Sequence, residues 1–248
     1  MAYIDVEYVD NIAVLTLNNG ATNAINPGLL EEFSQALLEV KRQAKGMLLC
    51  GGAKIFSMGF ELPALIDLPR AEMRAFLDNF NELTLALYIL PLPVICVMAG
   101  HTVAGGSIFA LACDYRLASV ESKKVGLNEI RLGVPVPYLA DLLLKQIVGE
   151  RQALSLLYSG AFLSFPEALE IGLIDETHAP DKLKEQALQK VAGLAAYNQA
   201  AFAEIKRNRT EEIREKYLKN GAARSEIFLD CWFSASTRQF LEDAARKF

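Results

Sequence analysis

Residues 83–113 contain no Asp, Glu, Lys or Arg, and this uncharged stretch limits the possible folds more than any other feature. A membrane-spanning helix would need about 20 apolar residues in a single helical run. Prolines and glycines interrupt the stretch and leave pieces of strand and helix length. It therefore predicts the buried centre of a globular domain, and we expect no membrane partner.

Length and composition favour one globular domain. Of the 248 residues, 52% are apolar and 22% are charged, close to ordinary globular usage. The net charge of −5 lacks the basic excess typical of nucleic-acid binding, so no nucleic-acid partner is expected. The four cysteines form no C-x-x-C pair, which argues against a metal site. Reduced cysteines and an N-terminus unlike a signal or transit sequence indicate a cytoplasmic protein.

Strand and helix patterns alternate along most of the chain. Alternating residues at 3–8 and 12–18 predict a β-hairpin. Short apolar runs at 47–50 and 94–98 predict buried strands, and 70–90 has helical periodicity. Five further helices are expected: one that starts at Asn26-Pro27, 105–113, 137–148, 150–159, and one with a capping box at Ser164 and Glu167.

Residues 181–247 are mostly helix formers with many charges, and no strand pattern follows residue 178. Strands that alternate with helices, followed by helices alone, indicate an α/β body with a helical C-terminal appendage. We therefore divide the chain into an α/β core, 1–180, and a helical C-terminal region, 181–248.

Three segments contain residues suited to catalysis or ligand binding: IFSMGFEL (55–62), AGHTVAGGSIF (99–109) and VGLNEIRLGVPVP (125–137). The second resembles a P-loop in spacing, but Gly106 stands where the lysine belongs. Glycines that open a helix can admit a ligand to free N–H groups, or they can permit close packing. The residues leave both interpretations open.

The other two segments pose similar choices. Ser57 is not in a nucleophile elbow, because Ile55 stands where that turn needs glycine. Glu129 lies among apolar residues of the third segment. It is either a surface residue on an edge or a buried acid with a raised pKa.

Taken together, these segments resemble the enoyl-CoA hydratase/isomerase (crotonase) superfamily. The similarity also covers NAIN (23–26), 94–119 and SFPEALEIGLIDE (164–176). The resemblance implies an α/β fold built as a crotonase-like spiral of strand-strand-helix units, with a helical C-terminal trimerisation region. It further implies an acyl-CoA substrate, no cofactor beyond that coenzyme A thioester, and a homotrimer or a dimer of trimers.

The resemblance also implies a site. In the family two backbone N–H groups form an oxyanion hole for the thioester oxygen. The resemblance implies that here they belong to Phe60 and Gly105. Coenzyme A lies along the first loop. The implied substrate-binding residues are Lys54, as a phosphate partner, with Met58, Gly59, Glu61, Leu62, Gly106 and Asn128. Lys206 and Arg207 could reach coenzyme A phosphates across a subunit boundary.

Glu129 is the implied catalytic residue. Hydratases of the family carry two glutamates, and the first falls at Ile108 here. One acid suffices to move a proton from C2 of a 3-enoyl-CoA to C4. GLNEIRLGV and CDYRLAS also resemble the mitochondrial-type Δ3,Δ2-enoyl-CoA isomerases more than hydratases. The resemblance therefore favours a double-bond isomerase with Glu129 as its proton shuttle.

Other members of the superfamily remain as alternatives. Dienoyl-CoA isomerases and the dehalogenase branch lose support, because Pro137 and Val136 stand where each needs an aspartate. An enoyl-CoA hydratase, a decarboxylase of malonyl-type thioesters, and a non-catalytic acyl-CoA- or protein-binding member stay open. Fold similarity alone does not separate them.

Overall fold

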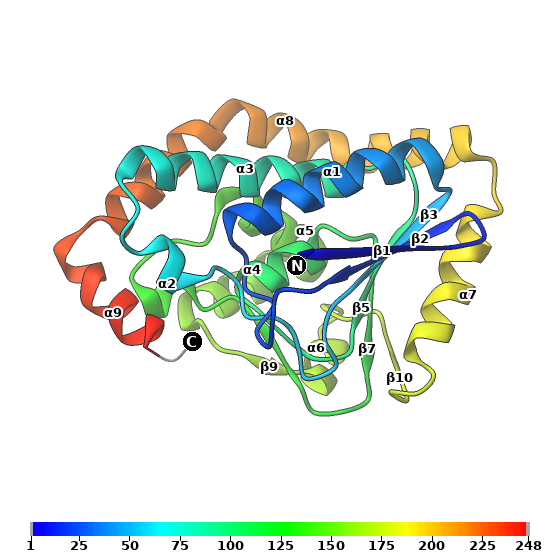
Figure 1. Cartoon of the computed structure of the whole chain (residues 1–248), viewed down its shortest axis with the longest axis horizontal. Coiled ribbons are helices and arrows are strands. Elements are labelled where there is room, and N and C mark those ends of the chain that lie inside the picture. Colours follow the sequence, from blue (N-terminus) through cyan, green and yellow to red (C-terminus); the bar gives the residue numbers. More distant parts are fainter. Residues whose placement is uncertain (1, 247–248) are drawn as a thin grey trace.

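The chain folds into two β-sheets with helices packed on them, in a computed structural model that describes residues 2–246 (Figure 1). Among these residues, no helix combines the length and low polarity that crossing a membrane requires. The elements occur in this order: β1 (Ile4–Val9), β2 (Ile12–Leu17), α1 (Pro27–Gln43), β3 (Gly46–Cys50), β4 (Ile55–Ser57), α2 (Leu62–Leu65), α3 (Arg70–Tyr88), β5 (Val94–Met98), β6 (His101–Val103), α4 (Gly105–Leu111), β7 (Tyr115–Ser119), β8 (Lys124–Gly126), the 3₁₀ helix η1 (Glu129–Leu132), α5 (Tyr138–Ser159), β9 (Leu163–Ser164), α6 (Phe165–Glu170), β10 (Glu176–His178), α7 (Leu183–Ala195), α8 (Gln199–Trp232) and α9 (Ala235–Ala245).

The larger sheet has the strand order β1-β2-β3-β5-β7-β10, and the smaller one has β4-β6-β8-β9. The predicted hairpin is confirmed, because β1 and β2 pair antiparallel. From β2 to β10 the larger sheet is parallel. In the smaller sheet β4, β6 and β8 are parallel and β9 runs antiparallel to β8. Parallel neighbours need long crossover connections, which here contain the helices.

One unit recurs along the chain: a strand of the larger sheet, a strand of the smaller sheet, and a helix. It is seen as β3-β4-α3, β5-β6-α4 and β7-β8-α5. This arrangement confirms the expected α/β fold of strand-strand-helix units. Because β4, β6 and β8 run in the same direction, the loops that follow them meet at one edge of the smaller sheet.

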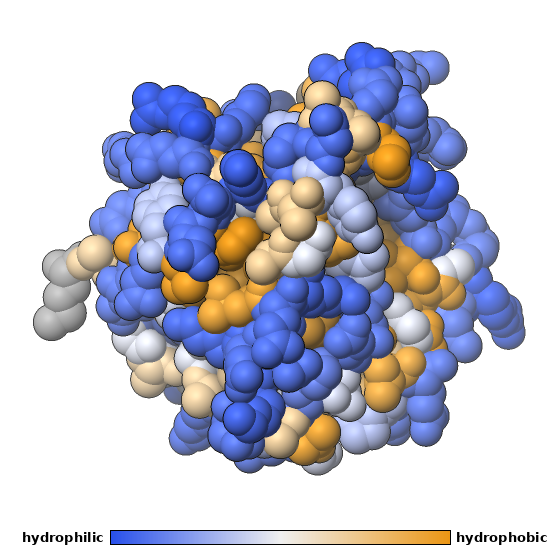
Figure 2. All heavy atoms as spheres, turned by 90° about the vertical axis from the view of Figure 1, so that its right-hand side faces the viewer, coloured by the Kyte–Doolittle hydropathy of each residue, from blue (hydrophilic) through white to orange (hydrophobic). Residues whose placement is uncertain are grey.

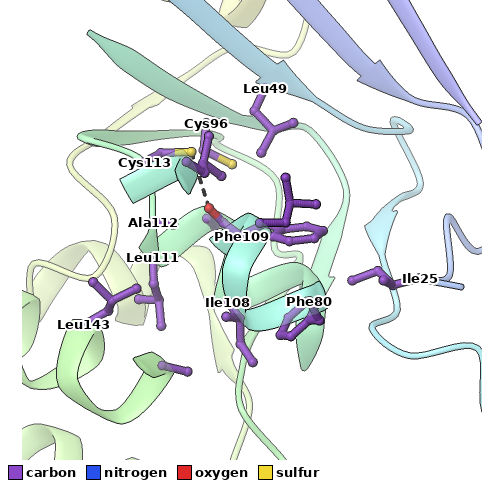
Figure 3. Packing of buried hydrophobic residues seen from close by; sticks show 14 of the residues in the cluster. Ile25, Leu49, Phe80, Cys96, Ile108, Phe109, Leu111, Ala112, Cys113 and Leu143 are labelled. Carbon is purple, nitrogen blue, oxygen red and sulfur yellow. Dashed lines mark hydrogen bonds between the residues drawn. The ribbon is translucent and has the colours of Figure 1, made fainter. Parts of the chain in front are cut away.

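The uncharged stretch forms the centre of the core, as its composition predicted. Every residue of α4 is buried. Figure 3 shows Phe109 of α4 beside Phe80 of α3, with ring centroids 5.2 Å apart. The Cys113 thiol donates to the Phe109 carbonyl oxygen at 3.3 Å. Helix α4 is therefore held on all sides, which fixes the position of its first residue.

Local sequence signals set several helix ends. Asn26 caps α1 by accepting a hydrogen bond from the Leu29 N–H at 2.8 Å. Ser164 and Glu167 form the predicted capping box of α6. The two helices expected on either side of Gly149 are one element, α5, with a kink at that residue, where φ is 78° and ψ is 165°.

The helices of the C-terminal region pack on the core. Helix α7 places Leu183, Ala187 and Val191 against the outer face of the larger sheet. Figure 2 views the end of the molecule that carries α7, where hydrophobic side chains appear between hydrophilic ones. Helix α8 runs along α3 and α5, and α9 contacts α2 and η1. The last helices thus lie beside the loops at the edge of the smaller sheet.

Lys206 of α8 is a buried anchor, so the expectation that it reaches coenzyme A phosphates is wrong. Its side chain is 5% exposed, and Nζ donates to the Leu92 carbonyl oxygen at 3.0 Å and to Asp114 at 2.8 Å. Moving the ammonium group to a ligand would leave the Asp114 carboxylate without its cationic partner. Arg207 is exposed and pairs with Glu204 at 2.7 Å.

Candidate active site

The loops after β4, β6 and β8 open onto one cavity of about 510 Å³. Cavities at the carboxyl ends of parallel strands are the usual ligand sites of α/β proteins. Most of the lining is apolar, and its polar side chains are few. The lining residues are Thr22, Met58, Phe60, Leu62, Val103, Ala104, Gly105, Asn128, Glu129, Arg131, Leu132, Val134, Pro137, Phe162, Phe228, Trp232, Phe240, Asp243 and Ala244.

Glu129 is the first residue of η1, and its side chain is buried in the wall of this cavity. Its Oε2 atom is shielded from solvent and has no hydrogen-bond partner among residues 2–246. Burial raises the pKa of Glu129 to about 7, while the residue's own backbone N–H lowers it. A carboxyl group with a pKa near neutrality can both accept and return a proton.

This pKa predicts how stability depends on pH. The ordinary pKa of 4.5 rises to about 7 on folding, so stability falls as the pH rises from 4.5 to 7. Above pH 7 the carboxylate lowers the free energy of unfolding by about 3 kcal/mol. We expect the Glu129→Gln variant to melt above the wild type at pH 8 and near it at pH 4.5. Calorimetry at both pH values measures this, and an equal difference at both would contradict the raised pKa.

The loop after β4 presents an unpaired backbone donor. The Ile25 N–H donates to the Gly59 carbonyl oxygen at 2.7 Å, and the Glu61 N–H donates to the Ile25 carbonyl oxygen at 2.9 Å. In such a parallel bridge the intervening N–H, that of Phe60, points to the opposite side. It has no protein acceptor within residues 2–246. The Phe60 ring packs edge-on against Phe76 at 4.9 Å, which holds the loop in place.

A second unpaired donor lies at the start of α4. The Gly105 N–H is the first of this helix and has no acceptor in the described part of the chain. Ala104 before it has φ 48° and ψ −125°, a conformation that side-chain-bearing residues rarely adopt. Two hydrogen bonds hold it: the Ala104 N–H donates to the Gly126 carbonyl oxygen at 2.9 Å, and the Ala104 carbonyl oxygen accepts from the Ile108 N–H at 3.0 Å. The direction of the Gly105 N–H is therefore fixed.

The two donor loops touch each other. Gly59 has φ +86°, and a Cβ atom on it would lie 2.8 Å from the Gly105 nitrogen and 2.7 Å from the Ala104 Cβ. Only glycine fits this contact. Two fixed N–H groups on residues that line one cavity suit an oxygen that gains negative charge during a reaction.

Ser107 connects the start of α4 with the strand that leads to Glu129. Its hydroxyl group donates to the Thr102 carbonyl oxygen at 2.6 Å and accepts from the Gly126 N–H at 3.1 Å. The Ser107 side chain is buried. This link fixes the end of β8 relative to α4, and so fixes the acid relative to the donor of Gly105.

Six of the ten site residues expected from the sequence line the cavity: Met58, Phe60, Leu62, Gly105, Asn128 and Glu129. The other four do not. Glu61 accepts hydrogen bonds from the side-chain amides of Asn19 and Asn26. Gly59 and Gly106 make close backbone contacts instead. Lys54 precedes β4 and therefore lies at the opposite end of that strand from the cavity.

Sequence reasoning missed the wall that α8 and α9 contribute. Phe228 and Trp232 of α8 stack with ring centroids 6.0 Å apart, and Phe240 of α9 joins them in the lining. Arg131 and Asp243 add two charges to the lining. The available signal was the pair Phe228 and Trp232, four residues apart at helical spacing, with Trp232 the chain's single tryptophan.

Solved structures share this fold. The human mitochondrial delta3-delta2-enoyl-CoA isomerase matches with a TM-score of 0.95 at 24% identity, covering 99% of this chain and 97% of that one. The enoyl-CoA hydratase from Bacillus halodurans matches with a TM-score of 0.90 at 22% identity, covering 97% and 99%. At these identities the likeness shows the fold, which is that of the crotonases.

Sequence comparison gives the family. A family model described as Enoyl-CoA hydratase/isomerase matches residues 7–248. The chain is 32% identical to mitochondrial enoyl-CoA delta isomerase 1 of Mus musculus over 190 residues, which are 74% of this chain and 65% of that protein. It is also 32% identical to a probable enoyl-CoA hydratase of Bacillus subtilis (strain 168), over 71% of each chain. The chain belongs to the enoyl-CoA hydratase/isomerase family, as its sequence segments predicted, and its match spans less than two thirds of the mouse protein.

Proposed function

We propose that this chain converts a 3-enoyl-CoA to a 2-enoyl-CoA, with Glu129 as the catalytic proton shuttle. The observation that carries the proposal is a buried carboxyl group with a free oxygen, in an apolar cavity whose lining includes Phe60 and Gly105, two residues with unpaired backbone N–H groups. Within residues 2–246, Glu129 is the only buried carboxylic acid in the lining.

The reaction follows from these groups. The thioester oxygen accepts hydrogen bonds from the N–H groups of Phe60 and Gly105. Ionised Glu129 takes a proton from C2, and the electron pair moves onto the thioester as an enolate. Donors aimed at the developing oxyanion contribute about 3–4 kcal/mol each. Glu129 returns the proton to C4, so the double bond moves from C3–C4 to C2–C3 without water.

The remaining expected contacts take different parts in this proposal. Met58, Leu62 and Asn128 line the cavity, and in the proposal they contact the substrate directly. Gly59, Glu61 and Gly106 act through the shape of the two loops, because their contacts are with the protein. Lys54 is exposed, and in the proposal it meets a coenzyme A phosphate outside the cavity.

Hydration is the main alternative, since a relative named as a probable hydratase is 32% identical. The family's hydratases use two glutamates to position water. Ile108 stands where the first belongs, 1% exposed and outside the cavity lining. Asp243, the second carboxyl group in the lining, is half-exposed and is bonded by Gln239 and Arg246. This set of groups favours proton transfer over water addition.

The deciding experiment offers the purified chain 3-enoyl-CoA and 2-enoyl-CoA in separate reactions. Isomerisation produces the conjugated 2-enoyl thioester from the first substrate, and hydration removes it from the second. We expect rapid conjugation and little hydration. Hydration without conjugation would make the chain a hydratase, while carbon dioxide release from a malonyl-type thioester would make it a decarboxylase. Absence of acyl-CoA binding would leave a non-catalytic role.

We also propose that the helical region, residues 181–248, joins chains into a homotrimer or a dimer of trimers. Exposed apolar side chains on α8 support this, with Ile205 64%, Leu218 58% and Ile227 48% exposed. Such residues on one long helix suit burial against another copy. Sedimentation equilibrium measures the mass, and a monomer at micromolar concentration would oppose the proposal.

A further inference from the structure

The last helix of the chain is attached to the turn that carries Glu129. Thr237 in the first turn of α9 is 3% exposed, and its hydroxyl group donates to the Gly133 carbonyl oxygen at 3.0 Å. Gly133 ends η1 with φ 80°. About a hundred residues separate the two partners in sequence, so this contact exists only in the folded chain.

The contact is close and specific. A Cβ atom on Gly133 would lie 2.6 Å from the Thr237 hydroxyl oxygen and 3.3 Å from its Cβ. The Gly133 N–H donates to the Ile130 carbonyl oxygen at 3.2 Å, and the Val134 N–H donates to the Glu129 carbonyl oxygen at 3.2 Å. The turn that begins at Glu129 therefore closes directly beside the threonine.

Helix α9 is fixed at further points. Ser234 caps it by accepting a hydrogen bond from the Thr237 N–H at 3.3 Å. Arg238 donates to the Ile66 carbonyl oxygen at 2.7 Å and to Asp67 at 2.8 Å. Leu241 is fully buried beneath the helix. With α9 held in this way, its later residues form one wall of the cavity.

We propose that Thr237 is a positioning residue, which fixes the Glu129 turn against α9 and thereby keeps water away from the carboxyl group. This role rests on the proposed function only where it concerns catalysis. The threonine does not touch the cavity, because it is absent from the lining within the described chain. Its hydroxyl group acts through Gly133, and the wall of α9 then shields the acid.

The charged groups that share the cavity with Glu129 are few. Arg131 lies on its own turn and Asp243 on α9, and α5 adds no charged residue to the lining among residues 2–246. Burial is the cause that raises the pKa of Glu129. Water that reaches the carboxyl group would therefore lower this pKa toward 4.5.

The test compares Thr237→Val, which keeps the shape and loses the hydroxyl group, with Thr237→Ser, which keeps the donor. Ser236→Ala is the matched control, because Ser236 is an exposed residue of the same helix turn. Carbon-13 NMR titration of glutamate carboxyl groups reads the pKa of Glu129, whose signal is assigned by its absence in Glu129→Gln. This reading does not depend on the reaction catalysed.

We expect the Val variant to lower the pKa of Glu129 and to reduce kcat on the order of tenfold, with KM within about twofold. The Ser variant should restore both, and Ser236→Ala should change neither. An unchanged pKa in the Val variant would overturn the proposal, as would equal effects of the Val and Ser variants. A wild type that does not isomerise would defeat the proposed function, while the titration would still decide the role of Thr237.

Discussion

Replacing Glu129 by glutamine is expected to slow isomerisation of 3-enoyl-CoA by about 10²–10⁴-fold, the range that positioned acid–base groups supply. Glutamine has the shape of the acid but cannot take the C2 proton. The N–H groups of Phe60 and Gly105 are unchanged, so acyl-CoA should still bind. Steady-state kinetics measures the loss in kcat, and calorimetric titration with a saturated acyl-CoA measures binding.

The pH dependence of kcat/KM for the wild type should report the titration of Glu129. Burial raises the pKa of Glu129 to about 7, and the ionised form starts the reaction, so kcat/KM should rise with pH up to about 7 and then level. Asp243→Asn is the matched control, because Asp243 is the other carboxyl group of the lining. It should keep kcat within a few-fold. If glutamine at position 129 retained most of the activity, the assignment of Glu129 would be lost.

Much of the fold follows from short-range signals in the sequence. The β1–β2 hairpin, the Asn26 cap and the buried helix α4 are each specified by neighbouring residues. The smaller sheet is different. Its strands have only two or three residues, too few for an alternating pattern to be recognised. They exist because the longer strands beside them bring three loops together, and no local pattern contains that information.

The candidate site likewise has parts that the sequence predicts and parts that it does not. The sequence around Glu129 predicts an apolar setting, but on the residues alone a surface glutamate fits better. The cavity that Glu129 lines is completed by α8 and α9, which come from about a hundred residues later and carry Phe228, Trp232 and Phe240. A cavity wall made by distant segments gives only a weak local signal in the sequence, which here is an aromatic pair at helical spacing. Resemblance to a family supplied what the local pattern could not.

Gly59→Ala is expected to reduce kcat by about 10²–10³-fold, the effect of losing one oxyanion donor. The added Cβ atom would lie 2.8 Å from the Gly105 nitrogen and 2.7 Å from the Ala104 Cβ. Both neighbours belong to the backbone or sit directly on it, so the two loops must separate. Alanine at φ +86° adds strain of about 1 kcal/mol. Kinetics with 3-enoyl-CoA and thermal unfolding measure the two effects separately.

The Gly172→Ala variant separates the effect of backbone strain at positive φ from the effect of the steric clash in Gly59→Ala. Gly172 has φ +74°, and no atom lies within 4 Å of the Cβ that alanine would add. This variant should lose about 1 kcal/mol of stability and keep kcat within about twofold, because the residue lies outside the cavity lining. The comparison therefore assigns any further loss in Gly59→Ala to the displaced donors. If Gly59→Ala were as active as Gly172→Ala, the paired N–H groups would not hold the thioester oxygen.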